Sequence, residues 1–244
     1  MLSEFFDQFN IVSLVSIPVF FGNWLITFTN SSLMMTSVII FLSLFFFNNK
    51  LIPNRWQSIM ELIYVNIRYT VHDNLRFVGQ KYFPFIISIF LFIAIMNILG
   101  LFPFVFTPTA HIIITFGMSF SIIIAIIISG FITFKLNFLS ILMPGGVPIF
   151  LAPFLVVIET LSFMIRAISL GVRLAANISA GHLLFAILSG FAFNMFINGL
   201  MFLSIFPLLI MIFITLLEIM VAVIQAYVFT LLTTIYFVDT IALH

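Results

Sequence analysis

The sequence predicts an all-α integral membrane protein, and two properties of its composition carry that prediction. Of the 244 residues, 64% are hydrophobic and only 6% are charged, and the mean hydropathy is +1.37. A soluble domain of this size needs far more polar surface. We expect about three transmembrane helices, an interfacial amphipathic helix, and two long, strongly tilted membrane-embedded helices in an antiparallel hairpin, all in a single membrane domain over residues 1–244.

The composition also excludes several classes of function. The net charge is +1, so nothing favours a nucleic-acid partner. The absence of cysteine excludes disulfides, thiolate metal sites and thiol catalysis. The four histidines lack metal-ligand spacing, and we expect neither a metal nor a bound cofactor. The first ten residues carry Glu4 and Asp7 but no basic residue, unlike a secretory signal or a transit peptide. We therefore expect a bacterial or organelle-made protein, and the 35 phenylalanines favour an organellar gene.

Four elements are predicted in the first part of the chain. Residues 30–47 form an apolar stretch about one bilayer span long. Residues 51–80 alternate apolar and charged side chains at steps of three to four, which indicates an amphipathic helix at the membrane interface. Residues 83–106 and 112–134 are two further spans, joined by a short uncharged loop around Pro108.

The basic residues predict the orientation. They follow the first span within residues 48–82 and the third span at Lys135, and the 104–111 loop has none. The positive-inside rule therefore places 48–82 and Lys135 inside and the N-terminus outside. Residues 135–153 hold three prolines and two glycines, which indicates an ordered loop.

Two very long apolar segments end the chain, at residues 154–197 and 208–239. The first, if helical throughout its 44 residues, would be about 66 Å long, against a hydrocarbon core of about 30 Å. The helix must therefore break, at Gly181 or Gly190, or lie steeply tilted. Small residues between 169 and 181 would let another helix approach closely.

Arg173 lies inside the first of these apolar segments. A charge at mid-bilayer costs about 2.5–3.5 kcal/mol on insertion scales, so it needs a partner, water or a function. Glu159 and Arg166 precede it by 14 and 7 residues, and a step of seven falls only about 20° short of two helical turns. The three side chains therefore share one face. The second segment carries a similar polar line: Glu218, Gln225 and Asp239. Two such lines suggest a buried path for a small ion.

His182 follows Arg173 by nine residues, about half a turn in angle, so it points away from the arginine and could meet Glu218 on the second long helix. Structural interpretations remain open beside the functional ones. Arg166 could snorkel to lipid headgroups, and Glu159 and Asp239 could cap helices at the interface. Asn97 fits a helix-packing hydrogen bond better than a site.

Five segments carry a resemblance to a known family. They are SLGVRLAANISAGHLL at 169–184, NILGLFPF, ELIY, APFLVVIE and IQAYVFTLLTTIY. Together they resemble subunit a of the rotary F-type ATP synthases, the stator part of the membrane motor, strongly over residues 50–244. Bacterial members commonly place an acid at the position of His182 and a histidine at that of Glu218, so this chain resembles the mitochondrial arrangement.

The resemblance implies a non-catalytic, proton-translocating subunit in the mitochondrial inner membrane, with the bacterial plasma membrane as the alternative. Its partners would be the c-ring, the peripheral stalk, other membrane-sector subunits and lipids. The implied roles are Arg173 as the stator arginine facing the c-ring, His182 and Glu218 in the half-channel open to the intermembrane space, Glu159 and Asp239 in the matrix half-channel, Gln225 beside the arginine, and Asn177 and Arg166 in support.

Two other classes remain alternatives. A proton-coupled secondary transporter or antiporter would also use buried charges, but it typically has internal repeats and broken helices near the midplane, and we find no repeat between the two halves of the chain. A structural membrane scaffold would not need an arginine at this depth.

Overall fold

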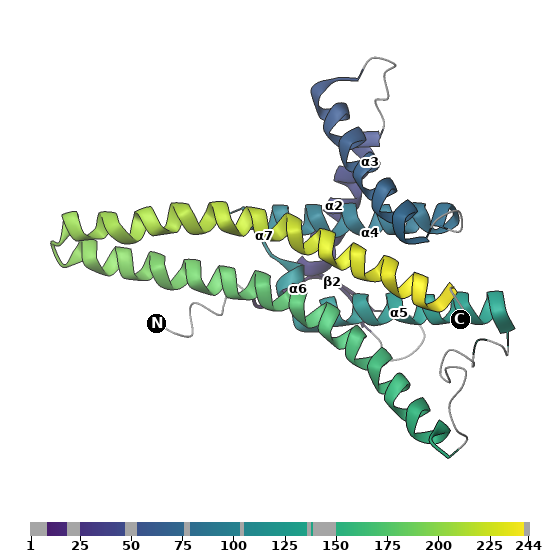
Figure 1. Ribbon diagram of the computed structural model, residues 1–244. Coiled ribbons are helices and arrows are strands. Elements are labelled where there is room, and N and C mark those ends of the chain that lie inside the picture. Colours follow the sequence, from purple (N-terminus) through teal and green to yellow (C-terminus); the bar gives the residue numbers. More distant parts are fainter. Residues whose placement is uncertain are drawn as a thin grey trace. The chain divides into compact units, whose positions relative to one another are not determined.

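The computed structural model describes residues 9–18, 25–46, 53–75, 79–102, 105–135, 138 and 150–241. Most of the predicted loop 135–153 and the basic residues Lys50 and Arg76 lie outside these residues. The helices are α2 (Asn30–Phe46), α3 (Arg55–Leu75), α4 (Gly79–Gly100), η2 (Pro108–Ala110), α5 (Ile112–Phe134), α6 (Ala152–Ile197) and α7 (Met201–Ile241) (Figure 1). Helices α4 to α7 are long and apolar enough to cross a membrane, and α2 is a shorter apolar helix. The predicted all-α membrane class is confirmed.

A small β-hairpin precedes α2 and was not predicted. Strands β1 (Ser13–Pro18) and β2 (Leu25–Thr29) pair antiparallel, with Ser16 opposite Thr27. β2 is rich in β-branched and aromatic residues, and β1 contributes Val15 and Ile17; such residues fit a pleated surface. The chain then enters α2 through a reciprocal cap, in which the Thr29 N–H donates to Ser32 Oγ at 2.9 Å.

Prolines explain where two predicted helix boundaries differ from the structure. The span expected at 83–106 runs from Gly79 to Gly100, and the helix expected at 208–239 starts at Met201. The predicted segments begin at residues 83 and 208, beside Pro84 and Pro207, and proline is favoured in the first turn of a helix. Each lies instead in the second turn of its helix, where its missing N–H leaves only one carbonyl near the helix end without its usual bond.

The amphipathic helix is also shorter than predicted. Helix α3 ends at Leu75 and α4 begins at Gly79, so the end of the predicted 51–80 segment belongs to the next span. The buried face of α3 consists of Ile67, Val71 and Leu75, which repeat at steps of four. Other apolar side chains of α3, such as Trp56 and Leu62, are exposed among its charged residues. A helix that mixes exposed apolar and charged side chains in this way suits a membrane interface.

Helices α6 and α7 are continuous over 46 and 41 residues, about 69 and 62 Å at 1.5 Å per residue. Helix α6 does not break at Gly181 or Gly190, so the tilted alternative is the correct one: neither helix could stand upright in a core of about 30 Å. Helix α6 ends in a Schellman motif, in which the Leu200 N–H donates to the Met195 carbonyl at 3.1 Å. Gly199, at φ +79°, supplies the left-handed residue that this motif requires.

The chain forms two compact units. Unit 1 comprises Met1–Asn48, Leu91–His111 and Ala175–Ala226. It therefore holds the β-hairpin, α2, the end of α4, the second half of α6 and the first half of α7. Fully buried side chains from these elements form its core: Val38, Ile93, Met96, Ile178 and Ala222.

Unit 2 comprises Asn49–Phe90, Ile112–Leu174 and Tyr227–His244. It holds α3, the start of α4, α5, the first half of α6 and the end of α7. Its core includes Ile86, Ile126, Leu170, Leu174 and Phe229. Each long helix thus contributes one half to each unit, so the predicted polar lines are distributed over both.

Candidate functional site

In unit 1, polar side chains of α6 and α7 meet where the two helices run antiparallel side by side (Figure 1). Asn177 Nδ2 donates to Gln225 Oε1 at 3.0 Å. One turn further along α6, the Glu218 carboxylate packs against Gly181. A Cβ added at Gly181 would lie 2.8 Å from Glu218 Cδ and closer still to Oε1. Glycine is therefore the residue that lets this carboxylate reach the α6 backbone, next to His182.

Several polar atoms of unit 1 are buried without a hydrogen-bond partner among the described residues. They include His182 Nε2, Glu218 Oε1, Gln225 Nε2 and Asn97 Oδ1. In a dry interior each such atom costs about 1–3 kcal/mol. Unpartnered polar atoms of this kind are consistent with a region that exchanges hydrogen bonds with water.

Two histidines share one aromatic neighbour in this unit. The Phe9 ring meets the edges of the His111 and His182 rings, with centroid distances of 6.4 and 6.3 Å. His111 also stacks on Phe106 at 5.2 Å. Burial lowers the pKa of His111, because a buried site disfavours the charged imidazolium. We therefore expect His111 to be neutral at physiological pH.

The titratable side chains of unit 1 are few. Within its described residues they are only His111, His182 and Glu218. All described lysines, arginines and aspartates belong to unit 2. A proton moving through unit 1 by side-chain titration thus has only these three groups available among the residues described.

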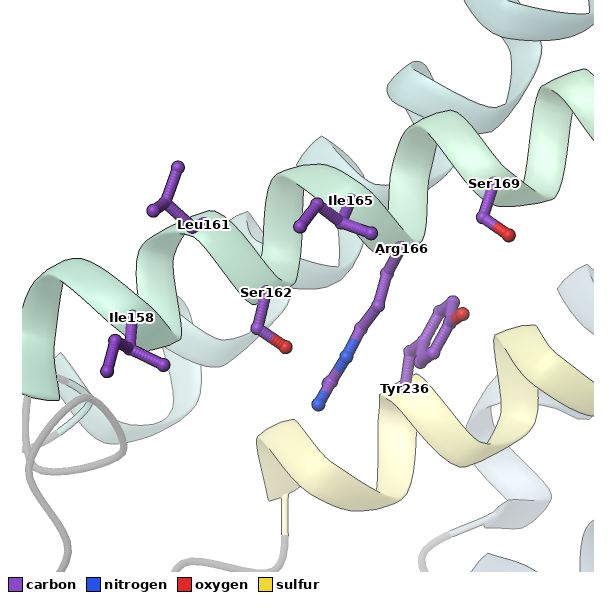
Figure 2. A pocket seen from close by; sticks show the side chains of 7 residues that line it. All are labelled: Ile158, Leu161, Ser162, Ile165, Arg166, Ser169 and Tyr236. Carbon is purple, nitrogen blue, oxygen red and sulfur yellow. The ribbon is translucent and has the colours of Figure 1, made fainter.

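Unit 2 contains an ion pair between the two long helices. Arg166 Nη1 lies 3.0 Å from Asp239 Oδ2, with the two side chains 30% and 41% exposed. The Arg166 guanidinium also lies over the rings of Phe163 and Tyr236, at 5.2 and 5.5 Å from their centroids. Such cation–π contacts contribute about 0.5–1 kcal/mol at exposed sites. Figure 2 shows the Arg166 side chain extending from α6 beside the ring of Tyr236 on α7.

An open groove of about 480 Å³ lies beside Arg166, one partner of this ion pair. Its polar lining comes from Arg166, Tyr236, Ser162 and Ser169, and its apolar lining from Ile158, Leu161 and Ile165 (Figure 2). Glu159, which follows Ile158, is half-buried, and it forms no ion pair with another side chain that the structure describes.

Arg173 points to an exposed face of α6. Its only described side-chain hydrogen bond is a long one, from Nη2 to Ser169 Oγ at 3.4 Å, and it has no carboxylate partner within the described parts of the chain. The opposite face of α6, about 200° round the helix, is packed tightly: a Cβ at Gly171 would lie 2.9 Å from the Phe116 Cα of α5. Arg173 therefore lies on an exposed face of α6, and no carboxylate of the described residues neutralises it.

The structure brings together some of the predicted residues and not others. It pairs Arg166 with Asp239 and Asn177 with Gln225, and it places Glu218 against the residue before His182. It gives Glu159 no partner among described residues. Sequence reasoning missed Tyr236, although this residue precedes Asp239 by three positions and therefore shares its face of the helix.

Fold and sites together define a class: a polytopic helical membrane protein that carries ionisable side chains along two long helices. Comparison with known proteins then identifies the family. The chain belongs to the ATP synthase A chain family, whose model matches residues 29–238, and the resemblance found in the sequence is confirmed. It is 57% identical to ATP synthase subunit a of Metridium senile over 244 residues, all of both chains. It is 46% identical to that of Marchantia polymorpha over 248 residues, 98% of each chain.

Proposed function

We propose that this chain is the non-catalytic stator subunit of the membrane sector of an F-type ATP synthase, and that it carries protons to and from a rotating ring of c subunits. Its cargo is the proton itself, so it needs no bound cofactor. The peripheral stalk, other membrane-sector subunits and lipids complete its surroundings. We place it in the mitochondrial inner membrane as the product of an organellar gene, because His182 and Glu218 follow the mitochondrial arrangement.

The single observation that carries the proposal is the exposed Arg173 on an apolar membrane helix. A guanidinium facing lipid without a partner is costly, so its face of α6 suits a surface that supplies negative charge. Two opposite charges about 4 Å apart attract by about 4 kcal/mol at an effective dielectric near 20. That energy corresponds to about three pKa units. A ring carboxylate arriving from lipid in its protonated form would therefore ionise opposite Arg173 and release its proton.

Two separate sets of titratable groups then serve the two sides of the membrane. His182 and Glu218 in unit 1 form the access path from the outer side. Asp239, Glu159 and the groove beside Arg166 in unit 2 form the release path to the inner side. Arg173 itself opposes direct leakage, because a fixed cation repels a hydronium ion. Each proton that crosses about 100 mV releases about 2.3 kcal/mol, which would drive the ring.

The continuous α6 and α7 count against the transporter alternative. Secondary transporters typically bind their ions at discontinuous helices near the midplane, whereas these helices run unbroken for 46 and 41 residues.

The test is Arg173→Ala in the assembled complex, reconstituted into vesicles. We expect proton-driven ATP synthesis to fall at least about a hundredfold, equivalent to about 2.7 kcal/mol, while the amount of assembled complex stays unchanged. The matched control is Arg55→Ala, which removes an exposed arginine from α3 and should leave synthesis at the wild-type rate. Normal synthesis by an assembled Arg173→Ala complex would refute the proposal.

A further inference from the structure

Asn97 is the one fully buried polar side chain that links α4 to the polar segment of α7 among the described residues. Its side chain is 0% exposed, and its Nδ2 donates to the backbone carbonyl of Ala222 at 3.2 Å. Residue 97 and residue 222 are 125 positions apart. The bond is therefore a tertiary link and forms no part of any helix's own ladder.

The bond from Asn97 is made to α7 at Ala222, between two polar residues of that helix. Ala222 follows Glu218 by four residues and precedes Gln225 by three. Residues three and four apart lie on the same side of a helix, so a tether at Ala222 fixes the rotation of the turns that carry Glu218 and Gln225. A rotation of α7 by one residue, about 100°, would take Glu218 away from Gly181.

The other end of the same amide supports a role beyond packing. Asn97 Oδ1 is buried and has no hydrogen-bond partner within the described residues. A leucine of similar shape would fill the space without that cost, because an unpaired buried acceptor costs about 1–3 kcal/mol. Glu218 Oε1 and Gln225 Nε2, on the tethered turns, are unpartnered in the same way.

We propose that Asn97 is a positioning residue for the outer proton path: its N–H holds the α7 turns that present Glu218, and its carbonyl oxygen accepts a hydrogen bond within that path. This inference rests on the proposed function for its proton-flux readout. The titratable groups that unit 1 places in this path are His182 on α6, Glu218 on α7 and His111 before α5. Asn97 acts on them through geometry, because an amide does not titrate.

The experiment compares Asn97→Leu with a matched control in the assembled complex. The control is Ser119→Ala, because Ser119 is also 0% exposed and its hydroxyl also donates to a backbone carbonyl of a neighbouring helix, that of Ala167 at 2.9 Å. Ring-dependent proton flux is measured in vesicles and divided by the amount of assembled complex. We expect Asn97→Leu to lower this normalised proton flux about tenfold, equivalent to about 1.4 kcal/mol. The flux of Ser119→Ala should stay within about twofold of wild type.

Two further measurements separate positioning from simple loss of structure. The first is a double variant, Asn97→Leu with Glu218→Asp. If Asn97 acts through Glu218, Asn97→Leu lowers proton flux less in the Glu218→Asp background than it does in the wild type. If the two residues act independently, the two fold-losses in flux multiply. The second measurement is the rate at which Glu218 reacts with a carbodiimide, followed by mass spectrometry of the peptide that contains it. This rate reports the surroundings of the carboxyl whether or not the complex pumps protons, and we expect Asn97→Leu to change it severalfold.

The outcomes are distinguishable. A changed Glu218 reactivity in Asn97→Leu, with wild-type reactivity in Ser119→Ala, supports the positioning role. Wild-type Glu218 reactivity in Asn97→Leu overturns the positioning role. So does a double variant whose loss of flux equals the product of the two single-variant losses. Failure of the proposed function would appear elsewhere, as undiminished synthesis in Arg173→Ala.

Discussion

Gly181→Ala is expected to disable the outer proton path without unfolding the protein. The added Cβ would lie 2.8 Å from Glu218 Cδ, whereas ordinary van der Waals contact begins at 3.4 Å, so the carboxyl carbon must move by about 0.6 Å and the nearer oxygen by more. The carboxylate is the end of a flexible side chain, and displacing one of its torsions by about 30° from a staggered rotamer costs only about 0.5–1.5 kcal/mol. The helices should therefore stay in place while Glu218 moves away from the turn of His182.

We expect Gly181→Ala to lower proton flux strongly although it lowers the stability of the fold only slightly. A misplacement of about 1 Å can lower a proton-transfer or reaction rate by as much as about a hundredfold, so we expect ring-dependent proton flux to fall between about tenfold and a hundredfold. The assay is flux in reconstituted vesicles under an imposed potential, normalised to assembled complex. The matched control is Gly117→Ala on α5, where an added Cβ meets nothing within 4 Å and alanine should stabilise the helix by up to about 1 kcal/mol.

A second variant decides whether the added methyl acts through Glu218. Glu218→Asp shortens the side chain by one methylene and should relieve the contact, so the double variant is expected to carry more flux than Gly181→Ala alone. Wild-type flux in assembled Gly181→Ala would refute the reasoning, because Glu218 would then not need its observed position.

The remaining predictions concern the release path in unit 2. Glu159→Gln and Asp239→Asn should each slow proton release several-fold in vesicles while loading from the other side continues, and unchanged flux in both would favour interfacial capping. Arg166→Leu removes the partner of Asp239; the pair is partly exposed, so we expect at most about 1 kcal/mol of lost stability in thermal unfolding, but a several-fold slower release in the flux assay. Equal flux with and without Arg166 would make the ion pair purely structural. Tyr236→Phe keeps the ring beside Arg166 and should retain flux within about twofold, and a larger loss would assign a proton-relay role to the hydroxyl.

Local patterns in the sequence were sufficient for the class of protein and for most of the helices. The predicted span 112–134 coincides with α5, because its apolar run is bounded by polar turn residues on one side and Lys135 on the other. Two other helices begin before the predicted positions, at Gly79 and Met201, since a proline can lie inside a helix beyond its first turn. The spacing of seven predicts which residues share a helix face, because that grouping depends only on the geometry of one helix.

The sequence alone determined that this is a helical membrane protein, and it predicts which polar residues share a face on each long helix. Only the tertiary structure decided what each face meets: that Asp239 pairs with Arg166, 73 residues away, that Glu218 lies against Gly181, and that Asn97 reaches Ala222. Helical periodicity follows from local backbone geometry, which every segment carries in its own residues. Which residues of another helix a face contacts depends on how distant helices pack. A small residue such as Gly181 indicates a close approach, but only the structure shows which side chain lies against it.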